Sequence, residues 1–191
     1  MKKIIELRKI FKKFNLDGYI IPKNNNFFGE YVSFSEDNLK YISNFTGSAG
    51  FAVVLKNKNY MFVDGRYTTQ AGIQCGGRFQ ICTIPKKYPF DIFKNKNLNL
   101  GYDPKLHTEN SLNKLFGKTS IKLKPINNNL IDLLWKRKNN SSIKPFYLIK
   151  DKDAGLKVKQ KLTKLVKLIK LNKVNYLFTT ASENVAWLLN I

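Results

Sequence analysis

Histidine and cysteine are scarce in this chain of 191 residues, which holds one histidine, His107, and two cysteines, Cys75 and Cys82. Zinc sites in proteins are built mainly from these two residue types, usually in sets of three or four. The two cysteines form no CxxC pair, so we expect two buried free thiols there. Any metal centre built from this chain would have to rest on carboxylates.

Long apolar runs are also missing. No segment approaches the ~20 consecutive apolar residues that a membrane-spanning helix needs. The lysine-rich start MKKIIELRKIFKKF has neither the uninterrupted apolar core nor the small-residue cleavage site of a secretory signal. Its apolar residues recur at helical spacing over residues 4–14, which predicts an amphipathic helix. We therefore expect a cytoplasmic protein.

Acidic residues are few, since 13 Asp and Glu stand against 34 Lys and Arg, for a formal net charge of +21. Such an excess is typical of proteins that bind nucleic acids or acidic membranes. Here lysine supplies nearly all of the charge and is spread along the chain beside asparagine. Arginine, which reads bases better than lysine does, is rare. We expect solvated lysine-rich faces, with no nucleic acid or membrane as partner; a basic nucleic-acid surface is the alternative.

Helix and strand signals alternate through most of the chain. One clear hairpin is predicted where two apolar runs flank KNKN, over residues 51–65. This alternation predicts an α/β fold over residues 1–143, a three-layer sandwich with a mixed β-sheet flanked by helices. The other predicted strands are 16–22, 78–84, 98–104 and 120–126, and the predicted helices are 4–14, 36–45 with Ser35 as N-cap, 66–74, 108–116 and 129–136.

The helix and strand pattern of the amino-terminal residues recurs after a polar, charged linker. Residues 144–191 are predicted to hold this linker and a helix, a strand (174–180) and a further helix. At a shift of 157 residues, Lys13, Asn15 and Tyr19 fall on Lys170, Asn172 and Tyr176. This correspondence favours a duplicated domain. Because the sequence stops at the apolar NVAWLLNI, we expect a truncated second copy within a longer protein.

The glycine-rich stretch FTGSAGF, residues 45–51, is predicted to form a tight turn through Gly47 and Gly50. Phosphate-binding loops precede a helix, whereas these glycines precede a strand. Ser48 resembles the serine of a GxSxG elbow, but that elbow joins a strand to a helix. Its base could only be His107, which we interpret as a surface or capping residue. We therefore expect no serine–histidine catalysis.

The stretch FVDGRY, residues 62–67, ends a predicted strand with an acid, a glycine and an arginine. Asp64 can cap the following helix, and Gly65 can supply a backbone shape that other residues resist. Arg66 could pair with a carboxylate of its own domain or contact a substrate or partner. We keep Arg66 and Tyr67 as possible substrate or interface contacts.

Six motifs occur in an order that resembles a known family: GEYV, KYISNFTGSAGFAVV, MFVDGRYTTQA, LGYDP, NLIDLLW and ENVAWLLNI. Together they resemble the amino-terminal region of Xaa-Pro aminopeptidases of the aminopeptidase P type, in the creatinase/prolidase superfamily. The resemblance implies an enzyme that removes the amino-terminal residue before proline in short peptides. It also implies a separate pita-bread catalytic domain holding two ions, usually manganese, on two Asp, one His and two Glu.

The resemblance has consequences for this chain. None of those metal-ligand motifs is present, so we expect no catalytic, cofactor-binding or metal residue here, and no peptide hydrolysis by this chain alone. Such amino-terminal domains serve dimerisation and limit access to the active site, so the resemblance implies a homodimer in the full-length form. A stand-alone, non-catalytic creatinase-like binding module is the alternative.

Overall fold

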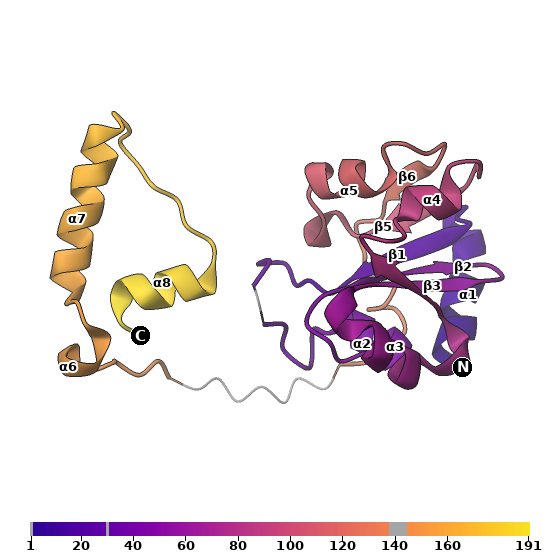
Figure 1. Cartoon of the computed structure of the whole chain (residues 1–191), viewed down its shortest axis with the longest axis horizontal. Helices are drawn as coiled ribbons and strands as arrows, with labels where there is room; N and C mark the ends of the chain where they lie inside the picture. Colours follow the sequence, from indigo (N-terminus) through magenta and orange to yellow (C-terminus); the bar gives the residue numbers. More distant parts are fainter. Residues whose placement is uncertain (1, 30, 138–144) are drawn as a thin grey trace. The chain divides into compact units, whose positions relative to one another are not determined.

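The computed structural model describes residues 2–29, 31–137 and 145–191 (Figure 1). The chain divides into two compact units. The first comprises Met1–Asn26 and Glu30–Asn139, and the second comprises Phe27–Gly29 and Asn140–Ile191. The predicted boundary between residues 143 and 144 lies outside the described residues, so it stays a prediction.

The first unit is built on one mixed sheet of six strands in the order β4-β3-β2-β1-β5-β6. Strand β2 is antiparallel to both of its neighbours, while β3–β4, β1–β5 and β5–β6 are parallel pairs. All strands except β2 therefore point one way, and their carboxyl ends share one edge of the sheet. The bounds are β1 Gly18–Pro22, β2 Phe51–Leu55, β3 Asn59–Asp64, β4 Gln80–Ile84, β5 Asn99–Tyr102 and β6 Lys122–Pro125.

Each face of the sheet carries its own apolar cluster, because successive side chains of a strand point to opposite faces. Tyr19 and Ile21 of β1 pack in one cluster with α1, α2 and α3, whereas Ile20 packs in the other with α4 and α5. The predicted three-layer α/β sandwich is therefore confirmed. The helices are α1 Lys2–Phe14, α2 Asn38–Ser43, η1 Gly65–Tyr67, α3 Thr68–Cys75, η2 Gly76–Arg78, α4 Pro89–Phe93, η3 Pro104–Leu106 and α5 Glu109–Phe116.

The start of α2 differs from the prediction that placed Ser35 at its N-cap. Asp37 is the N-cap, and its Oδ1 accepts a hydrogen bond of 2.9 Å from the backbone N–H of Lys40. Its other oxygen forms an ion pair with Lys23, and both side chains are largely buried. The cap therefore lies two residues later, where a lysine from beyond β1 holds the carboxylate in place.

The predicted helix over residues 129–136 is not formed, and the segment folds as successive turns. The side chain of Asn129 explains the difference, because its Oδ1 accepts a 2.9 Å hydrogen bond from the backbone N–H of Ile131. Such local side-chain bonds compete with helical hydrogen bonding. Leu130 and Ile131 are fully buried, whereas Leu133 is exposed.

The second unit contains α6 Asp151–Ala154, α7 Val158–Leu171 and α8 Ser182–Leu189. At the shift of 157 residues, the end of α1 at Phe14 falls on the end of α7 at Leu171. Residues 174–180, which correspond to β1 and were predicted as a strand, form none. Strand β1 pairs with β2 on one side and β5 on the other, and an extended segment without partners leaves its backbone groups unpaired.

Hydrogen bonds of Lys161 and Asn190 connect the helices of the second unit. Lys161 is buried, and its ammonium donates to the carbonyl of Trp187 and, at 2.6 Å, to Oδ1 of Asn190. A cation placed at the carboxyl end of α8 is favoured by the helix dipole. The amide of Asn190 in turn donates to the carbonyl of Leu156 at 3.0 Å. Among the described residues, no helix is both long and apolar enough to cross a membrane.

Candidate functional site

The FVDGRY turn holds its arginine against its own acid. Asp64 accepts a 2.9 Å hydrogen bond from the backbone N–H of Arg66 and so caps η1. The Arg66 guanidinium reaches back, with Nη2 at 2.7 Å from Oδ2 of Asp64. This charge-assisted hydrogen bond lowers the pKa of Asp64 and raises that of Arg66. The Arg66 side chain remains 73% exposed, so it keeps a face toward solvent.

The three glycines predicted to form turns differ in whether their positions could hold a residue with a Cβ atom. Gly50 has a φ of +153°, and a Cβ there would stand 2.8 Å from the carbonyl oxygen of Phe62. A Cβ on Gly47 would stand 2.2 Å from Cζ of the buried Phe45. Gly65 has no positive φ, and a Cβ there would meet nothing within 4 Å. The prediction that the turn needs glycine at position 65 is therefore wrong.

Ser48 and His107 have separate partners. The Ser48 hydroxyl lies 2.7 Å from the hydroxyl of Tyr67. The ring of His107 packs edge-to-face on Tyr102, with 5.8 Å between the ring centroids. His107 is half-buried at the C-cap position of η3, which agrees with the capping alternative of the prediction, and its Nε2 has no hydrogen-bond partner among the described residues. Burial lowers its pKa to about 4, against a smaller opposing effect of the Asp103 carboxylate.

The two cysteines are buried free thiols, as predicted. Burial raises the pKa of both Cys75 and Cys82. A thiol with a raised pKa is protonated at neutral pH and is a poor nucleophile. Neither cysteine is therefore a candidate for catalysis.

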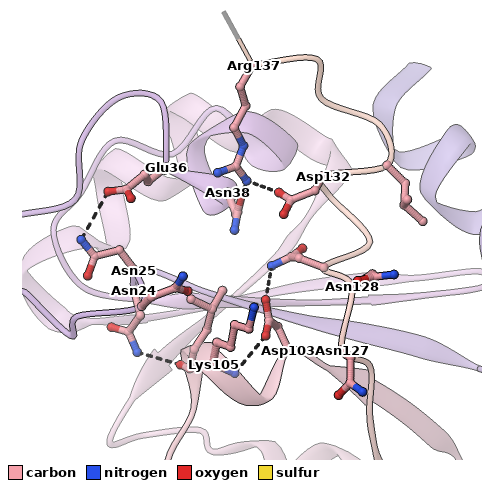
Figure 2. A pocket seen from close by; sticks show the side chains of 14 residues that line it. Asn24, Asn25, Glu36, Asn38, Asp103, Lys105, Asn127, Asn128, Asp132 and Arg137 are labelled. Atoms are coloured by element: carbon pink, nitrogen blue, oxygen red, sulfur yellow. Dashed lines mark hydrogen bonds and ion pairs between the residues drawn. The ribbon is translucent and has the colours of Figure 1, made fainter. Parts of the chain in front are cut away.

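A polar cavity of about 300 Å³ lies where β1, β5 and β6 end (Figure 2). Crevices at the carboxyl ends of strands are common ligand sites in open α/β sheets. The segments that follow β1, β5 and β6 contribute most of the wall. Residues at the start of α2 complete it. The lining residues are Asn24–Asn26, Glu36, Asn38, Asp103, Lys105, Leu106, Asn127–Asn129, Asp132, Leu133 and Arg137.

Hydrogen bonds fix one wall of the cavity. The buried carboxylate of Asp103 accepts from the backbone N–H of Lys105 and from the amide of Asn129, each at 2.9 Å. Because Asn129 also binds the backbone of Ile131, it ties the end of β5 to the turns after β6. On the other side, Asn24 donates to the carbonyl of Leu106 at 3.2 Å. These contacts hold the three strand ends in one arrangement (Figure 2).

Charges of both signs line the cavity. Arg137 forms an ion pair with Asp132 and donates to Oδ1 of Asn38 at 2.8 Å, while its buried Nε has no partner among the described residues. Burial raises the pKa of Asp132, which the Arg137 charge opposes. Within the described part of the chain, Glu36 and Lys105 form no ion pair. Asp103 forms no ion pair there either, and the Lys105 charge, like that of Arg137, opposes the raised pKa of Asp132. The described lining therefore carries three carboxylates and two cations.

The residues present do not fit a pair of manganese ions. In residues 2–29, 31–137 and 145–191, no group of three or more His, Cys, Asp or Glu side chains gathers as a metal site. In the cavity, Asp103 already accepts two N–H groups and Asp132 already pairs with Arg137. We therefore derive no metal-dependent step for this chain.

Asparagine runs in the sequence mark two of the strand ends that form the cavity. Two runs of three asparagines, residues 24–26 and 127–129, each follow a strand closely. Because β1 and β6 run in the same direction, on either side of β5, both runs reach the same edge of the sheet. The predicted contact residues Arg66 and Tyr67 do not line this cavity.

Comparisons with known proteins agree on one family. The Creatinase/Prolidase N-terminal domain model matches residues 3–133. Over 200 residues, the chain is 30% identical to a probable Xaa-Pro aminopeptidase P of Coprinopsis cinerea, covering 100% of this chain and 32% of that protein. It is also 30% identical over 183 residues to aminopeptidase P1 of Arabidopsis thaliana, covering 92% and 28%. The chain thus spans about a third of the length of these curated relatives.

Solved structures show the same fold. An X-prolyl aminopeptidase from Caenorhabditis elegans, described as a cytosolic enzyme with a di-nuclear active site, superposes with a TM-score of 0.83 at 25% identity. That match covers 99% of this chain and 34% of the worm protein. The N-terminal domain of the cytoplasmic peptidase PepQ from Mycobacterium tuberculosis superposes with a TM-score of 0.56 at 20% identity, covering 70% and 98%.

Proposed function

Because the chain belongs to the creatinase/prolidase N-terminal domain family, we propose that it is the non-catalytic amino-terminal portion of a longer Xaa-Pro aminopeptidase. That enzyme removes the amino-terminal residue before proline in short peptides. One observation carries the proposal. The chain is similar over its whole length to a probable Xaa-Pro aminopeptidase P of which it spans only a third.

Manganese and the catalytic groups belong, in this proposal, to a part of the protein outside these 191 residues. The described residues gather no ligand set of their own, and the family places two ions on a separate domain. Reading the coding sequence beyond the codon for Ile191 is the first test. Two Asp, one His and two Glu are expected within about 400 further residues, a domain-scale length. A stop codon directly after Ile191 would contradict the proposal and favour the stand-alone binding module.

We further propose that the chain contributes to a cytoplasmic homodimer and limits access to the active site, so that only short peptides enter. Two observations support this assignment: the worm relative is described as cytosolic, and Arg66 presents an exposed guanidinium that uses part of its donors on Asp64. Tyr67 lies directly beside it, with the Arg66 guanidinium carbon 5.2 Å from its ring centroid. These two side chains are the candidate contacts with a second subunit.

An Arg66→Ala variant of the longer polypeptide tests this contact. If Arg66 crosses a dimer interface, its loss weakens dimerisation by about tenfold or more, because charged interface contacts contribute about 1.4 kcal/mol or more. Sedimentation at several protein concentrations measures the dimer dissociation constant. Lys94→Ala, at an exposed position of the same unit, is the control. An Arg66→Ala protein with unchanged dissociation constant, activity and stability would show that the side chain has no such role.

A further inference from the structure

We propose that the cavity at the carboxyl ends of β1, β5 and β6 binds a small zwitterion, a free amino acid or a short peptide. Its ammonium group contacts Glu36 and its carboxylate contacts Lys105. This inference rests on the cavity alone and does not depend on the enzyme of which the chain is a part. The volume of about 300 Å³ lies at the lower end of the range for ligand pockets, which suits a molecule of this size.

Two lining groups of opposite charge, neither of them in an ion pair among the described residues, decide the class of ligand. Figure 2 shows Glu36 and Lys105 on different walls of the cavity, with no interaction drawn between them. Lys105 enters from the segment after β5, and Glu36 precedes α2. One oxygen of Glu36 accepts from Ser33 and Asn25, which orients the carboxylate. A ligand with one positive and one negative end can contact both of these groups at once.

Ligands of a single charge fit less well. A phosphate would carry only negative charge into a cavity lined by Glu36, Asp103 and Asp132, and a simple cation would carry only positive charge toward Lys105 and Arg137. A neutral sugar would give neither Glu36 nor Lys105 an oppositely charged contact. Since charged hydrogen bonds contribute more than neutral ones, the charge pattern favours the zwitterion over all three.

The remaining polar groups suit peptide or amino-acid recognition. Asn127 and Asn128 are exposed in the cavity wall, and each amide can both donate and accept, as a peptide group does. The buried Nε of Arg137 lacks an acceptor among the described residues. Buried polar groups are nearly always hydrogen-bonded, so a carbonyl or carboxylate oxygen of the ligand is a fitting partner.

The test uses the 191-residue chain and L-alanyl-L-alanine as probe, with binding measured by calorimetry. The matched probes are its N-acetyl form, which lacks the ammonium, and its carboxyl-terminal amide, which lacks the carboxylate. We expect saturable binding of the dipeptide and at least about tenfold weaker binding of both blocked forms, as expected for loss of one charged contact.

Two variants assign the ends of the ligand. Glu36→Gln should weaken dipeptide binding about tenfold and remove the preference over the N-acetyl form. Lys105→Met should weaken it similarly and remove the preference over the amide. Glu109→Gln and Lys94→Met, exposed positions outside the cavity, should bind like the unmodified chain. Thermal unfolding of each variant establishes that it is folded.

Four results would overturn the proposal. They are absence of saturable dipeptide binding by the folded chain, equal binding of the blocked forms, tighter binding of inorganic phosphate than of the dipeptide, and tighter binding of glucose. The last two would assign the cavity to an anion or to a neutral polyol instead.

Discussion

The free energy of unfolding should fall by about 3 kcal/mol between pH 7 and pH 4 through His107 alone. Burial lowers the pKa of His107 in the fold to about 4, from an ordinary value of 6.5. The cause is the removal of the imidazole from water, which penalises its charged form. The nearby Asp103 carboxylate opposes this effect without overcoming it.

The sign follows from where the proton binds. The unfolded chain takes up a proton at His107 near pH 6.5, whereas the folded chain does so only near pH 4. The stabilising contribution is therefore fully present above the unfolded pKa. It is lost as pH falls through the folded pKa, because protonation between the two values favours the unfolded state.

Urea unfolding of the 191-residue chain at pH 7 and pH 4 measures the effect, with His107→Gln as comparison. Because His107 is the only histidine in the chain, the variant removes this contribution and keeps every carboxylate. We expect the loss of stability to be smaller in the variant by about 3 kcal/mol. Equal losses in the two proteins would show that His107 is not held neutral by burial.

Replacing Asn129 with alanine should destabilise the chain by about 2 to 4 kcal/mol. The Asn129 amide donates to the buried Asp103 carboxylate and accepts from the backbone N–H of Ile131. Both partners lie in a region that excludes most water. Removing the amide takes one hydrogen bond from the Asp103 carboxylate and one from the backbone N–H of Ile131. Each unsatisfied buried group costs about 1 to 3 kcal/mol.

Asn128 provides the matched control, since it is adjacent and exposed. Asn128→Ala should change the free energy of unfolding by no more than about 0.5 kcal/mol, as expected for an exposed surface position. Chemical denaturation at neutral pH measures both variants. If Asn129→Ala were as stable as Asn128→Ala, the bridge between β5 and the turns after β6 would not hold this cavity wall.

Local patterns predicted much of the first unit because they follow from short-range physics. Residues 51–65 alternate around KNKN and form the β2–β3 hairpin, with Val53 opposite Tyr60. Thr108 caps α5 by accepting a hydrogen bond from the backbone N–H of Ser111. In each case the sequence separation is small, so the hydrophobic period or the cap residue alone specifies the structure.

Predictions failed where a distant residue decides the outcome. Asp37, not Ser35, caps α2, and Lys23 from beyond β1 binds that carboxylate. Residues 129–136 have helical periodicity, but Asn129 bonds to Ile131 and to Asp103 and forms a turn. The strand predicted at 174–180 shares the pattern of β1 but lacks the two neighbours that β1 has.

The cavity could not be foreseen as a site, because its walls come from segments up to about a hundred residues apart. Lys105 and Glu36 are separate surface charges in the sequence, and only the order β1-β5-β6 brings their segments to one edge. By contrast, the ring of His107 packs against Tyr102 of β5, which is a near neighbour in the sequence. The two asparagine runs mark two strand ends in the sequence, but they do not show which other segments face them.

Peptide hydrolysis tests the central claim, that this chain is the non-catalytic part of an Xaa-Pro aminopeptidase. The assay compares the 191-residue chain with the longer polypeptide of the same coding sequence, both with manganese. The substrates are a short peptide with proline in second position and its alanine counterpart. We expect the longer polypeptide to release the first residue from the proline peptide only, and the 191-residue chain to release none. Release by the 191-residue chain, or no release by the longer polypeptide, would contradict it.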